Sequence, residues 1–255
     1  MANRITKHDA DHYLYEIAKE YKKANRANPY AELIIVGGGA IMLGYNFRSS
    51  TEDFDVIIRG SSSLIKEIAN RIGDKNDLAN GWLNSDFSKT TSYSKELILH
   101  SKFYKTFCNC LDVRIVPDEY LIAMKLVSGR EYKHDCSDII GILSEAIQKK
   151  EPLSFDKIDR AVNELYGGWG LVSDDMKNFL NNVLKETDLE GLYYRIEEKE
   201  TVNRERLKQI LKENPELNKQ VDIAFSYLEN FDDDFASEKH NDEQIPEIYH
   251  RGRGR

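Results

Sequence analysis

Two aspartates separated by a single residue, Asp53 and Asp55, are the side chains of this 255-residue chain best placed to do chemistry. They open a stretch, residues 53–58, that alternates polar and apolar positions before becoming continuously apolar, which predicts a strand. Side chains two positions apart on a strand share a face at a spacing of roughly 6 to 7 Å. Two carboxylates in that arrangement could hold one or two hard cations.

The elements that must position these aspartates lie just before them in the chain. Residues 33–36 are apolar and rich in β-branched side chains, which predicts a buried strand, and three glycines, Gly37 to Gly39, end it. Residues 40–44 then read as a short helix, whose free N–H groups could receive a phosphate. A glycine turn followed by paired carboxylates is the layout of a metal-dependent nucleotide site.

Two common nucleotide-binding motifs fit the glycine turn less well. The dinucleotide fingerprint G-x-G-x-x-G needs a third glycine where this chain has Met42, and no Gly-Lys-Ser or Gly-Lys-Thr of a phosphate-binding loop follows the turn. Taken alone, the glycines could be a plain strand-to-helix turn. Taken alone, the two aspartates could be surface residues on an edge strand. Arg48, Ser49, Ser50 and Thr51, just before the aspartates, favour the functional interpretation.

With a hydrophobic strand, Gly-Gly, a short helix and then Asp-hydrophobic-Asp, the chain resembles the nucleotidyltransferases with a DNA polymerase β-like fold. The resemblance implies that residues 110–117 form a strand that carries Asp112 and that residues 120–126 form a helix that carries Lys125. Arg48 and Thr51 stand where the abortive-infection type toxin nucleotidyltransferases and their relatives carry R-x-x-T-x-D-x-D. The resemblance covers about residues 33–143.

The resemblance implies an α+β fold, with a mixed sheet flanked by helices, and transfer of a nucleotide from a nucleoside triphosphate to an acceptor. In this chemistry Mg²⁺ or Mn²⁺ ions held by carboxylates clamp the α-phosphate. Asp53 and Asp55 would bind both metal ions, and Asp112 would complete the site of the ion that activates the acceptor. The nucleotide-binding residues would be Gly37, Gly38, Ser50, Thr51 and Lys125. The lysine would act on the β- or γ-phosphate.

Structural roles are the alternative for several of these residues. Without the resemblance, Lys125 reads as a solvated helix residue and Asp112 as a polar residue on an exposed edge strand. Asp135 and Asp138 have the i, i+3 spacing of a salt-bridged helix face. Arg48 is expected to fix the loop ahead of Asp53 by hydrogen bonding.

Composition bounds the class of protein. The formal net charge of −8 argues against broad, nonspecific nucleic-acid binding but leaves room for a local basic groove. The three cysteines, Cys108, Cys110 and Cys136, lack the spacing of zinc ligands, so we interpret them as reduced thiols. No signal peptide or membrane-spanning apolar run is evident, so a cytoplasmic protein without a membrane partner is expected.

The chain divides into three parts by composition. Residues 1–150 are expected to form the nucleotidyltransferase domain and residues 151–235 a C-terminal helical domain, because apolar positions recur there at helical spacing. Residues 236–255 are polar and end in alternating arginine and glycine, which predicts a flexible tail.

Two classes of function fit these observations. In the first, the chain is an enzyme whose acceptor is RNA or tRNA, a protein or a small molecule, and it could be the toxin of a toxin–antitoxin or phage-defence pair with an antitoxin as partner. In the second, it is a catalytically silent nucleotidyltransferase-like module that binds a partner protein or a nucleotide. The combination of Asp53, Asp55, Asp112 and Lys125 favours the enzyme.

Overall fold

A five-stranded mixed sheet forms the centre of the N-terminal half, in a computed structural model that describes residues 3–219 and residue 221. The strand order is β5-β4-β2-β7-β6, and a separate two-stranded sheet joins β1 to β3. The strands are β1 (Ile5–Thr6), β2 (Ala31–Val36), β3 (Ser50–Thr51), β4 (Phe54–Arg59), β5 (Leu83–Asn84), β6 (Lys102–Phe107) and β7 (Leu111–Ile115).

The central strand β2 is buried along its whole length and is apolar except for Glu32. It pairs antiparallel with β4 on one side, where Val36 lies opposite Asp55, and parallel with β7 on the other, where Glu32 lies opposite Asp112. In β7, buried and half-buried residues alternate, as expected for a strand with one face packed and the other partly open. This pairing decides which ends of the strands meet.

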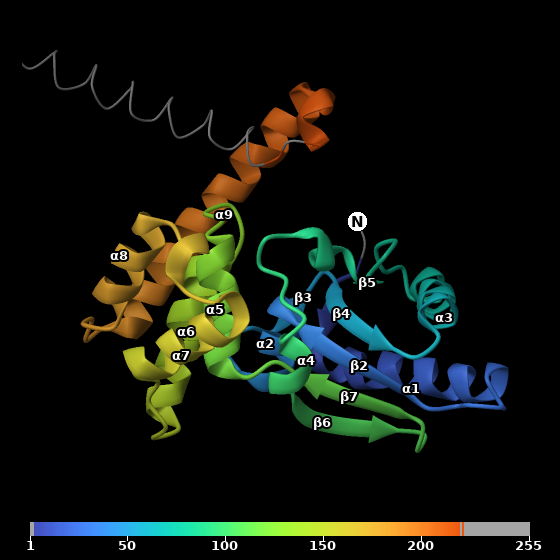
Figure 1. Ribbon diagram of the computed structural model, residues 1–255. Coiled ribbons are helices and arrows are strands. Elements are labelled where there is room, and N and C mark those ends of the chain that lie inside the picture. The colour runs from blue at the N-terminus through green and yellow to red at the C-terminus, as the bar shows by residue number, and fades with distance from the viewer. Residues whose placement is uncertain (1–2, 220, 222–255) are drawn as a thin grey trace, which may run out of the picture.

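Helices α1 (Lys7–Ala24) and α3 (Ser62–Lys75) pack against each other and flank the sheet (Figure 1). A reciprocal capping box between Thr6 and Asp9 starts α1, whose buried side chains recur on one face. The short helix α2 (Gly37–Gly44) follows β2 directly and contacts β4.

The remaining helices gather at one end of the sheet (Figure 1). They are α5 (Asp118–Ser128), α6 (Asp135–Gln148), α7 (Phe155–Tyr166), α8 (Asp174–Val183) and α9 (Leu189–Glu213). Helix α5 packs on α6 and α7, and α6 packs on α9. The helical layer therefore includes α5 and α6, which precede residue 150, as well as the helices that follow it. The short elements are α4 (Leu97–His100), η1 (Asp86–Lys89), η2 (Trp169–Leu171) and η3 (Pro215–Lys219).

The predicted fold class is confirmed: the chain is α+β, with a mixed sheet and a helical C-terminal region. No helix in the described part of the chain is long and apolar enough to cross a membrane. Cys108, Cys110 and Cys136 are all free thiols. The predicted tail, residues 236–255, lies outside the described residues.

Candidate functional site

The predicted glycine turn, Gly37 to Gly39, is the first turn of α2 in the structure, and it lies beside Asp55 at the end of the central strand. Asp55 lies opposite Val36, the last residue of β2, and a Cβ atom placed on Gly37 would lie 3.7 Å from Asp55 Oδ2. Asp53 is held through its backbone, because Thr51 Oγ1 donates a hydrogen bond of 3.0 Å to its carbonyl oxygen. Both carboxylates line a cavity of about 380 Å³.

No described residue neutralises these two carboxylates directly. Neither Asp53 nor Asp55 forms a side-chain hydrogen bond or an ion pair within the described part of the chain. Desolvation and the neighbouring charge of Asp53 raise the pKa of Asp55 to about 6. Two adjacent carboxylates that repel each other and face a cavity are typical of a cation-binding site.

The glycines allow close approach to the turn. Gly37 has a φ of +56°, in the left-handed region that favours glycine. A Cβ atom on Gly38 would lie 2.5 Å from Arg48 Nη2, so Arg48 packs directly over the turn. No side chain caps the N-terminus of α2 by a hydrogen bond.

Arg48 lies in the loop ahead of Asp53, between α2 and β3, and its hydrogen bonds anchor this loop to α6. Its Nη1 donates to both carboxylate oxygens of Asp138, at 2.9 and 2.7 Å. Ser50 Oγ accepts a hydrogen bond of 2.9 Å from Arg4 Nε. Of the two hydroxyl residues predicted to bind nucleotide, Thr51 lines the cavity.

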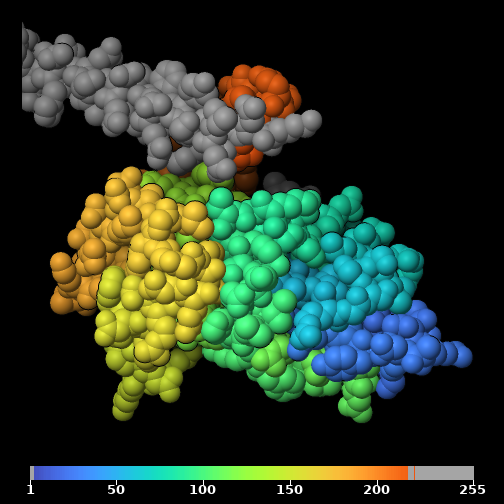
Figure 2. All heavy atoms as spheres, in the orientation of Figure 1, coloured from blue at the N-terminus to red at the C-terminus, as the bar shows by residue number. Residues whose placement is uncertain are grey.

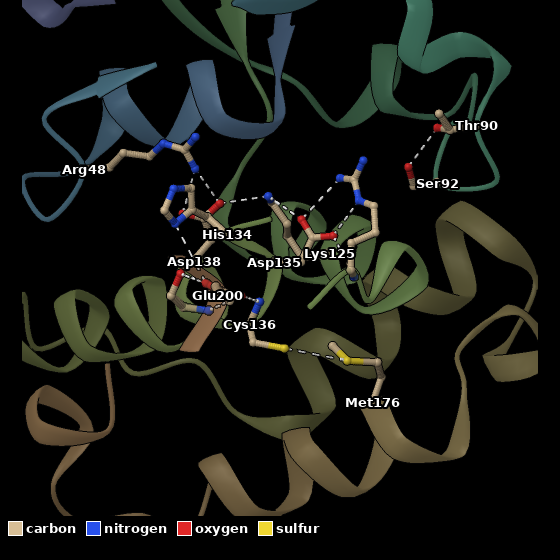
Figure 3. Close-up of polar contacts among 12 residues, drawn as sticks. Arg48, Thr90, Ser92, Lys125, His134, Asp135, Cys136, Asp138, Met176 and Glu200 are labelled. Atoms are coloured by element: carbon tan, nitrogen blue, oxygen red, sulfur yellow. Dashed lines mark hydrogen bonds and ion pairs between the residues drawn. The ribbon is translucent and has the colours of Figure 1, made fainter. Parts of the chain in front are cut away.

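Lys125 lies in a buried ion-pair network (Figure 3). Its Nζ is 2.7 Å from Asp135 Oδ1 and 2.8 Å from Asp138 Oδ2, and Arg130 Nε lies 2.9 Å from Asp135 Oδ2. Burial alone would lower the pKa of Lys125, but the charges of Asp135 and Asp138 raise it. The ammonium group of Lys125 is therefore already paired with the two carboxylates of α6, although its side chain lines the cavity. Asp135 and Asp138 form the expected salt-bridged face.

Asp112 does not join the other two aspartates, so the expected three-carboxylate cluster does not form. It lies opposite Glu32, four residues before Val36 along β2, which separates it from Asp55 by at least roughly 13 Å. Its carboxylate accepts hydrogen bonds from Tyr30 Oη at 2.9 Å and Thr106 Oγ1 at 2.5 Å. No group of three or more metal-ligating His, Cys, Asp or Glu side chains is found among the described residues.

Lys133 is a cavity residue that sequence analysis did not single out. It lies on the chain segment between α5 and α6 and lines the cavity. Its ammonium group forms no ion pair or hydrogen bond with any described residue. Desolvation and the charge of Arg130 lower its pKa, while Asp135 and Asp53 oppose that shift. The only sequence feature that points to Lys133 is its position, three residues after Arg130 and two before Asp135.

The opposite wall of the cavity comes from the segment between β5 and α4. Phe87, Thr90 and Ser92 line this wall, and the hydroxyl oxygens of Thr90 and Ser92 lie 3.0 Å apart (Figure 3). In Figure 2 this segment, in green, lies on the surface between the yellow helices and the cyan side of the molecule. Tyr166 on α7 anchors it, because Tyr166 Oη donates a hydrogen bond of 2.7 Å to Ser92 O.

The donor set fits one magnesium ion. Magnesium is commonly bound by one or two carboxylates together with substrate phosphates and water. Asp53 and Asp55 are hard oxygen donors without a partner among the described residues, and the cavity beside them has room for more ligands.

Comparison with known proteins agrees with this geometry. The family model described as "Nucleotidyltransferase of unknown function (DUF6036)" matches residues 12–167, more than half of the chain. The matched region includes the sheet with Asp53 and Asp55 and extends through α7. No curated protein and no solved structure gives a match. The chain therefore belongs to the DUF6036 family of nucleotidyltransferases of unknown function.

Proposed function

We propose that this protein is a metal-dependent enzyme that transfers a nucleotide from a nucleoside triphosphate to an acceptor. The observation that carries this proposal is the pair of unpartnered carboxylates, Asp53 and Asp55, facing a cavity that is also lined by Lys133, whose ammonium group is unpaired, all within the described residues. Adjacent sites for a metal ion and for phosphates are what nucleotidyl transfer requires.

The residues divide the work of substrate binding. Asp53 and Asp55 would hold Mg²⁺ or Mn²⁺, and the bound ion would neutralise charge on the phosphates and help activate the acceptor hydroxyl. Lys133 binds the outer phosphates as a point charge. The phosphate chain would approach the backbone of Gly37 and Gly38, which carry no side chains of their own, beside the Arg48 guanidinium that packs over Gly38. Lys125 acts indirectly, by fixing Asp135 and Asp138.

A second candidate function has one specific observation in its favour. Two of the predicted carboxylates line the cavity where the two-metal scheme uses three, because Asp112 lies at the other end of the strands. A nucleotidyltransferase-like module that binds a nucleotide or a partner protein without transferring anything needs no third acid. The same cavity would then serve binding alone.

Pyrophosphate release separates these two functions. The purified protein would be incubated with each of the four nucleoside triphosphates, magnesium or manganese, and cell extract as the source of RNA, protein and small-molecule acceptors. If the protein is an enzyme, the wild type should release more pyrophosphate than the Asp53→Asn variant. The label of the nucleotide should then appear on one class of acceptor. Equal release by the two proteins under every condition would leave the binding module.

A toxin role is a separate part of the proposal, supported by the resemblance to abortive-infection toxins. Expression of the wild-type protein should then arrest growth of a bacterial host, whereas the Asp53→Asn variant at the same protein level should not. Growth arrest by both proteins, or by neither, would contradict a toxin role that depends on nucleotide transfer.

A further inference from the structure

One face of α9 is directed at the chain segment that joins α5 to α6 and at the first turn of α6. The side chains of this face recur at intervals of one or three residues, which places them along one side of a helix. They are Lys199, Glu200, Asn203, Arg204 and Leu207. The segment that they contact, residues 131–137, adjoins Arg130 and includes Lys133, two cations that line the cavity.

The contacts hold the segment at successive points. Lys199 Nζ lies 2.7 Å from Glu131 Oε2, and Asn203 Nδ2 donates a hydrogen bond of 3.1 Å to Glu131 O. Arg204 Nη2 lies 2.8 Å from His134 Nε2. Leu207 packs against Tyr132 in a small apolar cluster in which both side chains are buried.

Glu200 is the most buried member of this face, with 2% of its surface exposed. Its Oε1 accepts hydrogen bonds from the backbone N–H groups of Cys136, at 2.8 Å, and Ser137, at 3.3 Å, and Ser137 Oγ donates to its Oε2 (Figure 3). The residue that precedes α6, His134, provides no side-chain cap. Glu200 therefore caps α6 from another helix.

The capped turn of α6 is also the turn that organises the cavity wall. It carries Asp135, which binds Lys125 and Arg130, and Asp138, which binds Lys125 and Arg48. A shift of this turn would therefore move Lys125, Arg130 and Arg48 together. Helix α9 lies beyond residue 167, where the match to the family ends.

We propose that α9 is a clamp for the nucleotide site: it fixes residues 130–138 in the conformation that presents Arg130 and Lys133 to phosphate, and Glu200 is its main positioning residue. The clamp rests on the proposed nucleotide-binding function. It comes from a part of the chain that the family model does not cover.

Two measurements on the full chain test the clamp. The first is hydrogen–deuterium exchange of the amides of residues 130–138 without ligand. The second is the dissociation constant for tripolyphosphate in the presence of magnesium, since this anion carries the phosphate chain common to all nucleoside triphosphates. Glu200→Ala is compared with Glu198→Gln, which changes an exposed carboxylate on the same helix, and with Glu200→Gln, which retains the Oε1 acceptor.

In Glu200→Ala we expect faster exchange in residues 130–138, unchanged exchange in β2 and β4, and tripolyphosphate binding weaker by about tenfold. Glu200→Gln should restore most of the affinity, and Glu198→Gln should match the wild type. Arg204→Ala should also speed exchange in this segment, which provides a second test if Glu200→Ala does not fold. Unchanged exchange in the segment would overturn the clamp, as would faster exchange with unchanged affinity. Failure of the wild type to bind tripolyphosphate and all four nucleotides would instead overturn the proposed function.

Discussion

At the residue scale, the site depends on how each charge is compensated. Lys125 and Lys133 both line the cavity, yet one is buried between two carboxylates and the other has an unpaired ammonium group within the described chain. Burying an unpaired charge is costly, so Lys125 has a structural task whether or not nucleotide binds. Lys133 has no comparable structural task.

This difference predicts opposite behaviour for the two lysines. Lys133→Ala should weaken triphosphate binding more than monophosphate binding, because only the outer phosphates would lie within its reach, and should change stability by less than about 0.5 kcal/mol. Calorimetric titration with the two ligands measures the first effect. Equal losses for both ligands would show that Lys133 does not contact the outer phosphates.

Lys125→Met should destabilise the fold instead. It would leave Asp135 and Asp138 in the core with fewer counter-charges, and breaking a buried pair costs about 3 to 5 kcal/mol. Chemical denaturation measures the free energy of unfolding. The exposed Lys157 on α7 provides the control, and Lys157→Met should change it by less than about 0.5 kcal/mol. Similar values for the two variants would contradict the structural role of Lys125.

The raised pKa of Asp55, about 6, predicts a pH dependence. Because the pKa in the folded state exceeds the ordinary aspartate value of 3.8, the contribution of Asp55 to the free energy of unfolding is fully present below pH 3.8 and is lost as pH rises through about 6. Metal binding has the opposite sign, since only the ionised carboxylate is a good ligand. Magnesium affinity should therefore fall as pH drops below about 6, and the same affinity at pH 5 and pH 7.5 would contradict a role for Asp55 as a ligand.

At the scale of elements, the close contact between the glycine turn and Arg48 couples α2 to α6. Gly38→Ala would place a methyl group 2.5 Å from the Arg48 guanidinium and disturb its bond to Asp138. We expect a loss of about 1 to 3 kcal/mol in the free energy of unfolding, the usual size of overpacking effects, together with weaker nucleotide binding. Gly170→Ala is the control, because nothing lies within 4 Å of its Cβ position. Equal stability of the two variants would show that the contact tolerates a side chain.

Local patterns in the sequence predicted the elements well, and pairing between distant elements accounts for the errors. Asp53 and Asp55 both line the cavity, as the strand periodicity of three neighbouring residues predicted, although β4 itself begins at Phe54. The position of Asp112 depends instead on how β7 is aligned with β2, and strand periodicity says nothing of which end of β2 it reaches. The partners of Lys125 lie on α6, and only tertiary packing brings them to it.

At the scale of the whole molecule, the cavity joins two layers. The sheet provides Asp53 and Asp55, and the helical layer provides Lys133 and the network that fixes the wall. Asp112 provides a matched control for these two aspartates. It lies at the other end of the sheet strands, and its carboxylate is held by two hydroxyl groups. This arrangement allows the central claim to be tested by comparing aspartates within one protein.

The most direct test is the change in melting temperature on adding magnesium together with a nucleoside triphosphate, measured for the wild type and for Asp53→Asn, Asp55→Asn and Asp112→Asn. Binding to the folded state raises the melting temperature. At a ligand concentration 100-fold above the dissociation constant, it stabilises the folded state by about 2.7 kcal/mol. We predict this shift in the wild type and in Asp112→Asn, and its loss in Asp53→Asn and Asp55→Asn, all four proteins being folded. A shift that survives in both Asp53→Asn and Asp55→Asn, or that is lost in Asp112→Asn alone, would contradict the assignment of the metal–nucleotide site.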